Sequence, residues 1–112
     1  MTKRSTILVV DDELINIHVI SSALKDEYNI ITADNGFAAL DLIKNPQPDL
    51  VLLDVMMPGL NGYDVCSSIK AEATFSDIPV IFLTALDTQE SAQRGFEVGA
   101  IDYVVPDLKL FY

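Results

Sequence analysis

Cysteine and long hydrophobic segments are nearly absent from this chain of 112 residues. Its single cysteine, Cys66, rules out a framework of internal disulfides and fits a reducing compartment. No apolar segment approaches the roughly 20 residues that cross a bilayer. The apolar residues 7–10 are followed directly by acidic residues, which argues against a signal peptide. These absences predict a cytoplasmic protein with no membrane partner.

Basic residues are also scarce. The chain has 7 lysines and arginines against 17 aspartates and glutamates, which gives a formal net charge of −10. A surface this acidic repels nucleic acid and anionic lipid, whereas it attracts cations and basic protein surfaces. Nucleic acid is therefore excluded as a partner of this domain, and metal cations become candidate ligands.

Five short apolar segments divide the chain. Most are rich in Val, Ile and Leu without alternation, which is typical of strands in a parallel sheet covered on both faces. Helical spacing lies between them. Ile15, Val19 and Ala23 recur at every fourth position, as do Ile20 and Leu24, and Val65 and Ile69 repeat that step. The predicted strands are Thr6–Val10, Asn29–Thr32, Leu50–Leu53, Val80–Leu83 and Tyr103–Val105.

This alternation predicts an α/β domain with a doubly wound, five-stranded parallel sheet in the order 2-1-3-4-5. The length fits one domain over residues 1–112. Only residues 106–112 follow the fifth predicted strand, which is too short for a closing helix. We therefore expect the last helix to be missing and one face of the sheet to be only partly covered.

Polar residues end three of the predicted strands. Asp11, Asp12 and Glu13 follow the first strand, Asp54 follows the third, and Thr84 follows the fourth. In the order 2-1-3-4-5 the first and third strands are neighbours, and ligands bind such sheets at the carboxyl ends of the strands beside this switch point. We therefore expect the three aspartates to converge on one crevice.

Clustered carboxylates require a proton or a cation. Two of them ~4 Å apart repel by about 4 kcal/mol at an effective dielectric constant of ~20. Hard oxygen ligands suit Mg²⁺, so Asp54 is a candidate metal ligand, or a nucleophile that forms an aspartyl phosphate. A simpler alternative is that Asp11 or Asp12 caps a helix that begins near Glu13.

Four motifs together resemble the receiver domain of bacterial two-component response regulators. They are VVDDE at residues 9–13, LLDVMMPGLNG at 52–62, Thr84–Ala85, and GAIDYVVP at 99–106. The resemblance extends from about Ile7 to Pro106 and implies a flavodoxin-like fold and a cytoplasmic signalling role.

The resemblance also implies a mechanism. A sensor histidine kinase would transfer a phosphoryl group to Asp54, and the transfer would shift the surface of the fourth helix and fifth strand. The domain would not be an enzyme beyond slow loss of its own phosphoryl group. By resemblance, Asp11, Asp12, Asp54 and the backbone carbonyl of Met56 would hold Mg²⁺, Thr84 would contact the phosphoryl group, and Tyr103 would be the switch aromatic.

The sequence departs from the family pattern after the fifth predicted strand. The family has Tyr-x-x-Lys-Pro where this chain has Tyr103-Val104-Val105-Pro106, so the lysine that contacts the phosphoryl group is absent. The family's last helix is replaced by residues 107–112, as if the domain were truncated or altered after about residue 106. We expect weaker phosphoryl binding, by about 1.5–3 kcal/mol, and we do not expect Lys109 to replace the missing lysine.

The sequence leaves one alternative function open and argues against another. A degenerate receiver would act as a non-switching interaction module, with a homodimer formed through the uncovered sheet face or the apolar tail at 108–112. A Mg²⁺ phosphatase with an aspartyl nucleophile would need a second aspartate two residues after the first, where this chain has Met56, which cannot transfer a proton.

Overall fold

The computed structural model describes residues 4–83, 97, 99 and 102–104. Five parallel strands form one sheet in the order β2-β1-β3-β4-β5, which confirms the predicted order. The helices are α1 (Leu14–Leu24), α2 (Gly36–Lys44) and α3 (Gly62–Ala71). The strands are β1 (Thr6–Val10), β2 (Asn29–Ala33), β3 (Leu50–Asp54), β4 (Val80–Leu83) and β5 (Asp102–Val104).

The strand boundaries follow the apolar segments closely. β1 and β4 coincide with the predictions, and β2 and β3 are one residue longer, so that Asp54 is the last residue of β3. The fifth strand, Asp102–Val104, begins one residue earlier than predicted, and Val105 of the predicted segment lies outside the described residues. The predicted absence of a closing helix concerns residues outside the described ranges.

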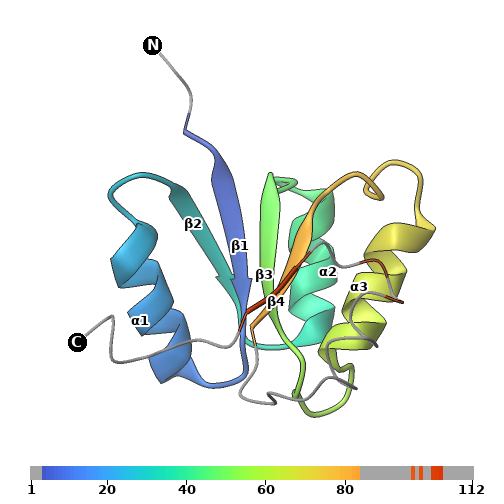
Figure 1. The fold of residues 1–112 in the computed structure, drawn as a ribbon, viewed down its shortest axis with the longest axis horizontal. Helices are drawn as coiled ribbons and strands as arrows, with labels where there is room; N and C mark the ends of the chain where they lie inside the picture. The colour runs from blue at the N-terminus through green and yellow to red at the C-terminus, as the bar shows by residue number, and fades with distance from the viewer. Residues whose placement is uncertain (1–3, 84–96, 98, 100–101, 105–112) are drawn as a thin grey trace.

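The helices lie on both sides of the sheet, with α1 on one face and α2 and α3 on the other (Figure 1). The α2–α3 side holds the larger cluster of buried side chains, which includes Val51, Leu53 and Phe82. On the α1 side Leu50 and Leu52 are only partly buried. Successive side chains of a strand point to opposite faces. The odd-numbered residues of β3 therefore pack into the larger cluster under α2 and α3, and the even-numbered residues pack against the smaller cluster under α1.

Helix α1 was predicted from the four-residue spacing of Ile15, Val19 and Ala23. The helix is confirmed, but this stripe is not its buried side, since 63% of the Ile15 side chain is exposed. Ile17 and Ile20 face the sheet instead, and Leu24, which shares the second predicted spacing with Ile20, packs against the same cluster. Several apolar residues on one short helix allow more than one stripe, and only packing against β1 selects between them.

Two helices begin at asparagines. The side chain of Asn35 accepts a hydrogen bond from the Ala38 N–H at 2.8 Å, and that of Asn61 accepts one from the Asp64 N–H at 3.0 Å. Each bond satisfies a backbone donor that has no partner within the helix. Among the described residues, no helix has the length and hydrophobicity of a membrane span.

Candidate functional site

The register of the central strands places two aspartates side by side. Val10 of β1 pairs with Leu53 of β3, and the residue after each is an aspartate, Asp11 or Asp54. One carboxylate oxygen from each of Asp11, Asp12 and Asp54 lies within 4.8 Å of the other two. The structure therefore brings together the three aspartates that the sequence placed at the strand ends.

Asp11 is held in a fixed position. Its side chain is only 6% exposed; Oδ1 accepts a hydrogen bond from the Glu13 N–H at 2.9 Å, and Oδ2 accepts one from Asn16 Nδ2 at 3.2 Å. Burial raises the pKa of Asp11, and these two hydrogen bonds oppose that rise. The residue before α1 is Glu13, which makes no side-chain cap bond. Asp11 thus binds the backbone at the helix entrance while it faces the other aspartates.

Asp54 is half-buried and has the most strongly perturbed carboxylate of the site. Burial, followed by the negative charges of Asp11 and Asp12, raises its pKa to about 7. Hydrogen bonds from the backbone N–H groups of Met56 and Val55 act in the opposite direction. Without a cation this group is partly protonated at neutral pH, so a positive ion in the crevice would bind in exchange for that proton.

The three carboxylates fit the requirements of a small divalent cation. Mg²⁺ lies ~2.1 Å from its ligands, so two ligands on opposite sides of the ion are about 4.2 Å apart. The 4.8 Å spread of these oxygens is slightly wider. Mg²⁺ retains several of its waters, so one carboxylate can bind through a water while the others bind directly. The donor set therefore fits Mg²⁺.

Gly62 holds the loop between β3 and α3 against the backbone of Asp54. Its N–H donates to the Val55 carbonyl at 2.9 Å. A Cβ atom at Gly62 would lie 2.2 Å from the Asp54 carbonyl oxygen and 2.8 Å from Val55 Cα, so only glycine fits here. The sequence predicted a helix edge at Gly62, which is where α3 begins, but not its contact with Asp54. No sequence pattern indicated a role for Asn16.

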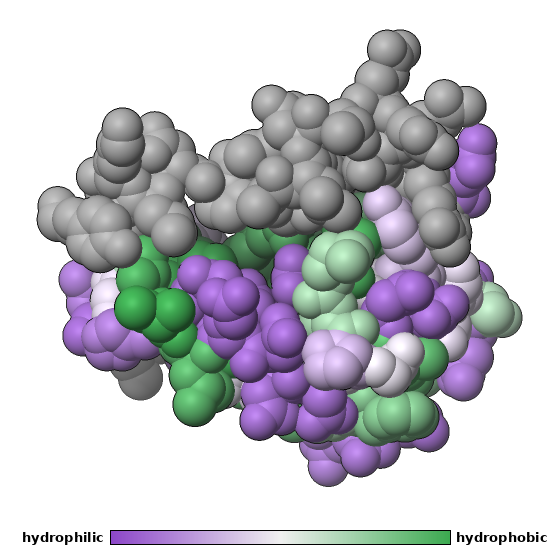
Figure 2. Space-filling model, turned by 90° about the horizontal axis from the view of Figure 1, so that it is seen from below, coloured by the Kyte–Doolittle hydropathy of each residue, from purple (hydrophilic) through white to green (hydrophobic). Residues whose placement is uncertain are grey.

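Exposed apolar residues lie next to the site residues in the sequence. Leu14, Ile15 and Met56 are all more than half exposed. They belong to the start of α1 and to the loop after β3. The view from the lower side of the ribbon in Figure 1 shows hydrophilic residues next to apolar ones on this edge of the molecule (Figure 2).

Other predicted site residues are only partly placed. Tyr103 lies in β5, where it pairs with Phe82 of β4, but its side chain is not among those described. Thr84, Lys109 and the tail at 108–112 lie outside the described residues. Met56 is described, and its exposed side chain leaves the proposed role to its backbone carbonyl.

A doubly wound parallel sheet with acidic residues where its two central strands end defines a class of α/β domains that bind ligands at the switch point. Within that class, the model of the response regulator receiver domain matches residues 7–109. The chain belongs to this family, as the four sequence motifs predicted.

Individual relatives agree with this assignment. A probable cyclic di-GMP phosphodiesterase of Vibrio cholerae serotype O1 is 46% identical over 99 residues, which are 88% of this chain and 22% of that protein. The chain spans less than half the length of the curated relatives that it matches.

Solved structures show the same fold. The chemotaxis protein CheY4 of Vibrio cholerae is 26% identical and superposes with a TM-score of 0.89 over 96% of this chain and 92% of that one. A BeF₃-activated DrrB receiver domain is 34% identical, with a TM-score of 0.85 over 96% of this chain and 91% of that one. The flavodoxin-like fold is thereby confirmed.

Proposed function

We propose that this chain is one receiver unit that accepts a phosphoryl group on Asp54 from a sensor histidine kinase in a Mg²⁺-dependent reaction. The observation that carries the proposal is the position of Asp54 at the end of β3, with its carboxylate within 4.8 Å of those of Asp11 and Asp12. Membership of the receiver family, whose proteins act in two-component signalling, supports the same role.

The chain's own residues account for most of the transfer chemistry. An oxygen of Asp54 attacks phosphorus, the phosphorus–nitrogen bond of the donor histidine breaks, and that nitrogen retains the electron pair. Asp11, oriented by Asn16, and Asp12 would hold the metal, while the amides of Val55 and Met56 orient the attacking carboxylate. Bound Mg²⁺ would neutralise charge on the phosphoryl oxygens and favour the ionised form of Asp54.

The proposed switch depends on residues beyond this acidic site. Thr84 would contact the transferred phosphoryl group, Met56 would supply a backbone carbonyl to the metal, and Tyr103 would change position with the surface of the fourth helix and β5. The domain itself would catalyse nothing beyond uptake and slow loss of its phosphoryl group. Because the chain spans only part of its curated relatives, the output that this switch controls is not part of the proposal.

Incubation with acetyl phosphate tests the proposal directly. With Mg²⁺ present, intact-mass spectrometry is expected to show addition of one phosphoryl group, and peptide mapping is expected to place it on Asp54. Neither Asp54→Asn nor the wild type in EDTA should gain mass. A folded wild-type protein that gains no mass at any Mg²⁺ concentration would contradict the proposal.

A second candidate is a receiver that does not switch and acts as an interaction module or homodimer. An apolar groove of about 410 Å³ on the α1 side of the sheet favours it. The groove is lined by Ile7, Leu50 and Leu52 from the sheet, by Leu24 at the end of α1 and by Tyr28 in the turn that follows it. The lysine missing from the sequence supports the same alternative.

The relative with a BeF₃-activated structure suggests how to separate the two functions. Beryllofluoride with Mg²⁺ should shift the amide NMR signals of β5 and its neighbours if this chain switches. If the shifts remain confined to residues next to Asp54 while sedimentation shows a dimer, the interaction module is the correct function.

A further inference from the structure

A second pocket lies between α2 and α3, away from the acidic site. Both helices run antiparallel to the strands, so their last turns lie at the edge of the sheet opposite the three aspartates (Figure 1). The pocket has a volume of about 220 Å³ and opens between these last turns. Neither the proposed phosphoryl transfer nor the family assignment accounts for it.

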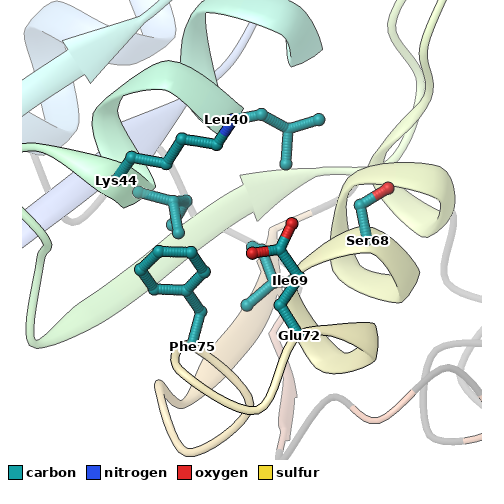
Figure 3. Close-up of a pocket in the computed structure, with 7 residues that line it drawn as sticks. Leu40, Lys44, Ser68, Ile69, Glu72 and Phe75 are labelled. Atoms are coloured by element: carbon teal, nitrogen blue, oxygen red, sulfur yellow. The ribbon is translucent and has the colours of Figure 1, made fainter.

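The inner wall of this α2–α3 pocket is apolar. Ile43 and Ile69 are almost completely buried, and Leu40 and Phe75 are partly buried against them. The ring of Phe75 points into the space between the helices (Figure 3). Leu40 and Phe75 keep exposed surface that an apolar ligand group could cover, above a floor formed by Ile43 and Ile69.

The loop that carries Phe75 is fixed by hydrogen bonds. The Phe75 N–H donates to the Glu72 carbonyl and the Ile78 N–H donates to the Phe75 carbonyl, each at 3.0 Å. From α3, Lys70 Nζ donates to the carbonyls of Ser76 and Ile78. The pocket wall is thus formed before a ligand binds, which reduces the entropy lost on binding.

Opposite charges line the two sides of the pocket. Lys44 at the end of α2 extends along one wall, and the carboxylate of Glu72 after α3 points into the space between the helices (Figure 3). Within residues 4–83 neither side chain forms an ion pair. Ser68 of α3 also lines the pocket. A ligand that carried both an anion and a cation could therefore pair with both walls.

The pocket volume indicates the size of the apolar group. A closed apolar cavity of about 150 Å³ holds benzene, and a water molecule takes about 30 Å³. The 220 Å³ of this pocket therefore accommodates a ring-sized group together with a small charged head. We infer that the α2–α3 pocket binds a free α-amino acid with a large apolar side chain, its carboxylate facing Lys44 and its ammonium facing Glu72.

The charge arrangement can be tested with three ligands of equal ring size. L-Phenylalanine carries both charges, 3-phenylpropanoate lacks the ammonium, and phenethylamine lacks the carboxylate. In ¹⁵N NMR titrations, L-phenylalanine is expected to shift the signals around Ile43, Ile69 and Phe75 saturably. Each analogue should bind roughly three- to tenfold more weakly, the range of one partly exposed charged contact.

Charge-removing variants then identify each contact. Lys44→Met should make L-phenylalanine and phenethylamine bind equally, whereas Glu72→Gln should make L-phenylalanine and 3-phenylpropanoate bind equally. Lys25→Met and Glu27→Gln, which make the same changes at exposed positions near the end of α1, should leave the order of the three ligands unchanged. Because each variant alters a ratio between ligands, partial unfolding cannot produce the expected result.

Three results would overturn the inference: no saturable shifts with L-phenylalanine, shifts outside the pocket only, or equal binding of all three ligands to the wild type. Asp54→Asn should bind L-phenylalanine like the wild type, since the pocket lies at the other end of the helices. Loss of phosphorylation and loss of amino acid binding are therefore distinguishable.

Discussion

The interior of β3 and its carboxyl end differ sharply although they are adjacent in the chain. Val51 and Leu53 have no exposed surface, and their burial against α2 and α3 stabilises the fold. The next residue, Asp54, is a half-buried carboxylate close to two others, and its pKa of about 7 shows that ionising it in the folded state is unfavourable. The sheet interior thus supplies stability that the acidic end reduces, as is common where a site is arranged for function.

The largest predicted loss of stability comes from a substitution in the interior of β3. Leu53→Ala should lower the free energy of unfolding by about 3–4 kcal/mol, because it removes a fully buried side chain and leaves a cavity. Leu52→Ala, on the partly buried α1 side of the same strand, should cost about 1–2 kcal/mol. Urea denaturation measures both. Equal losses would show that the two faces of the sheet contribute equally.

Gly62 connects the two regions, and its substitution is expected to have the next largest effect. Gly62→Ala should cost about 2–3 kcal/mol, because the new Cβ would overlap the Asp54 carbonyl and displace the loop. It should also weaken Mg²⁺ binding, measured by calorimetry.

Gly59→Ala is the matched control for Gly62→Ala. Gly59 has a φ of +78° and no atom within 4 Å of a new Cβ, so alanine should cost about 1 kcal/mol through backbone strain alone. Mg²⁺ affinity should be unchanged in this variant. If both variants bind Mg²⁺ like the wild type, Gly62 does not position the site.

The acidic end itself should respond to pH. The folded-state pKa of Asp54, about 7, lies above the ordinary value of 3.8, so the folded protein binds more protons between these values than the unfolded chain does. In EDTA, the stability that protonated Asp54 contributes is therefore fully present below pH 4, and it is lost as the pH rises through 7 and Asp54 ionises.

Asp54→Asn isolates this contribution. At pH 8 in EDTA the variant should be more stable than the wild type by roughly 2 kcal/mol, since one pKa unit corresponds to about 1.4 kcal/mol and partial exposure reduces the effect. The difference should disappear near pH 4. Thermal unfolding at several pH values measures it, and a difference independent of pH would mean that Asp54 is not perturbed as described.

The contrast between the buried strand interiors and their acidic ends also explains which features the sequence could predict. Uninterrupted apolar segments at Thr6–Val10 and Val80–Leu83 defined β1 and β4 to the residue, because burial on both faces leaves a continuous hydrophobic pattern. Convergence of Asp11 and Asp54 followed from parallel strands ending at one edge. The sequence could not decide which of the two spacings in α1 is buried, and it could not predict the close approach of Gly62, since both depend on contacts between segments distant in sequence.

Asn16 is the residue of the site whose removal should have the smallest effect. Its Nδ2 donates to Asp11 Oδ2 at 3.2 Å, a single hydrogen bond worth about 1 kcal/mol. Asn16→Ala should therefore weaken Mg²⁺ binding about fivefold and lower the free energy of unfolding in EDTA by about 1 kcal/mol, because the buried Asp11 carboxylate loses one donor. Ser22→Ala, on the exposed side of the same helix, should change neither quantity. If Asn16→Ala binds Mg²⁺ as tightly as the wild type, burial and the Glu13 N–H are sufficient to orient Asp11, and the acidic end is held by the backbone rather than by side chains of α1.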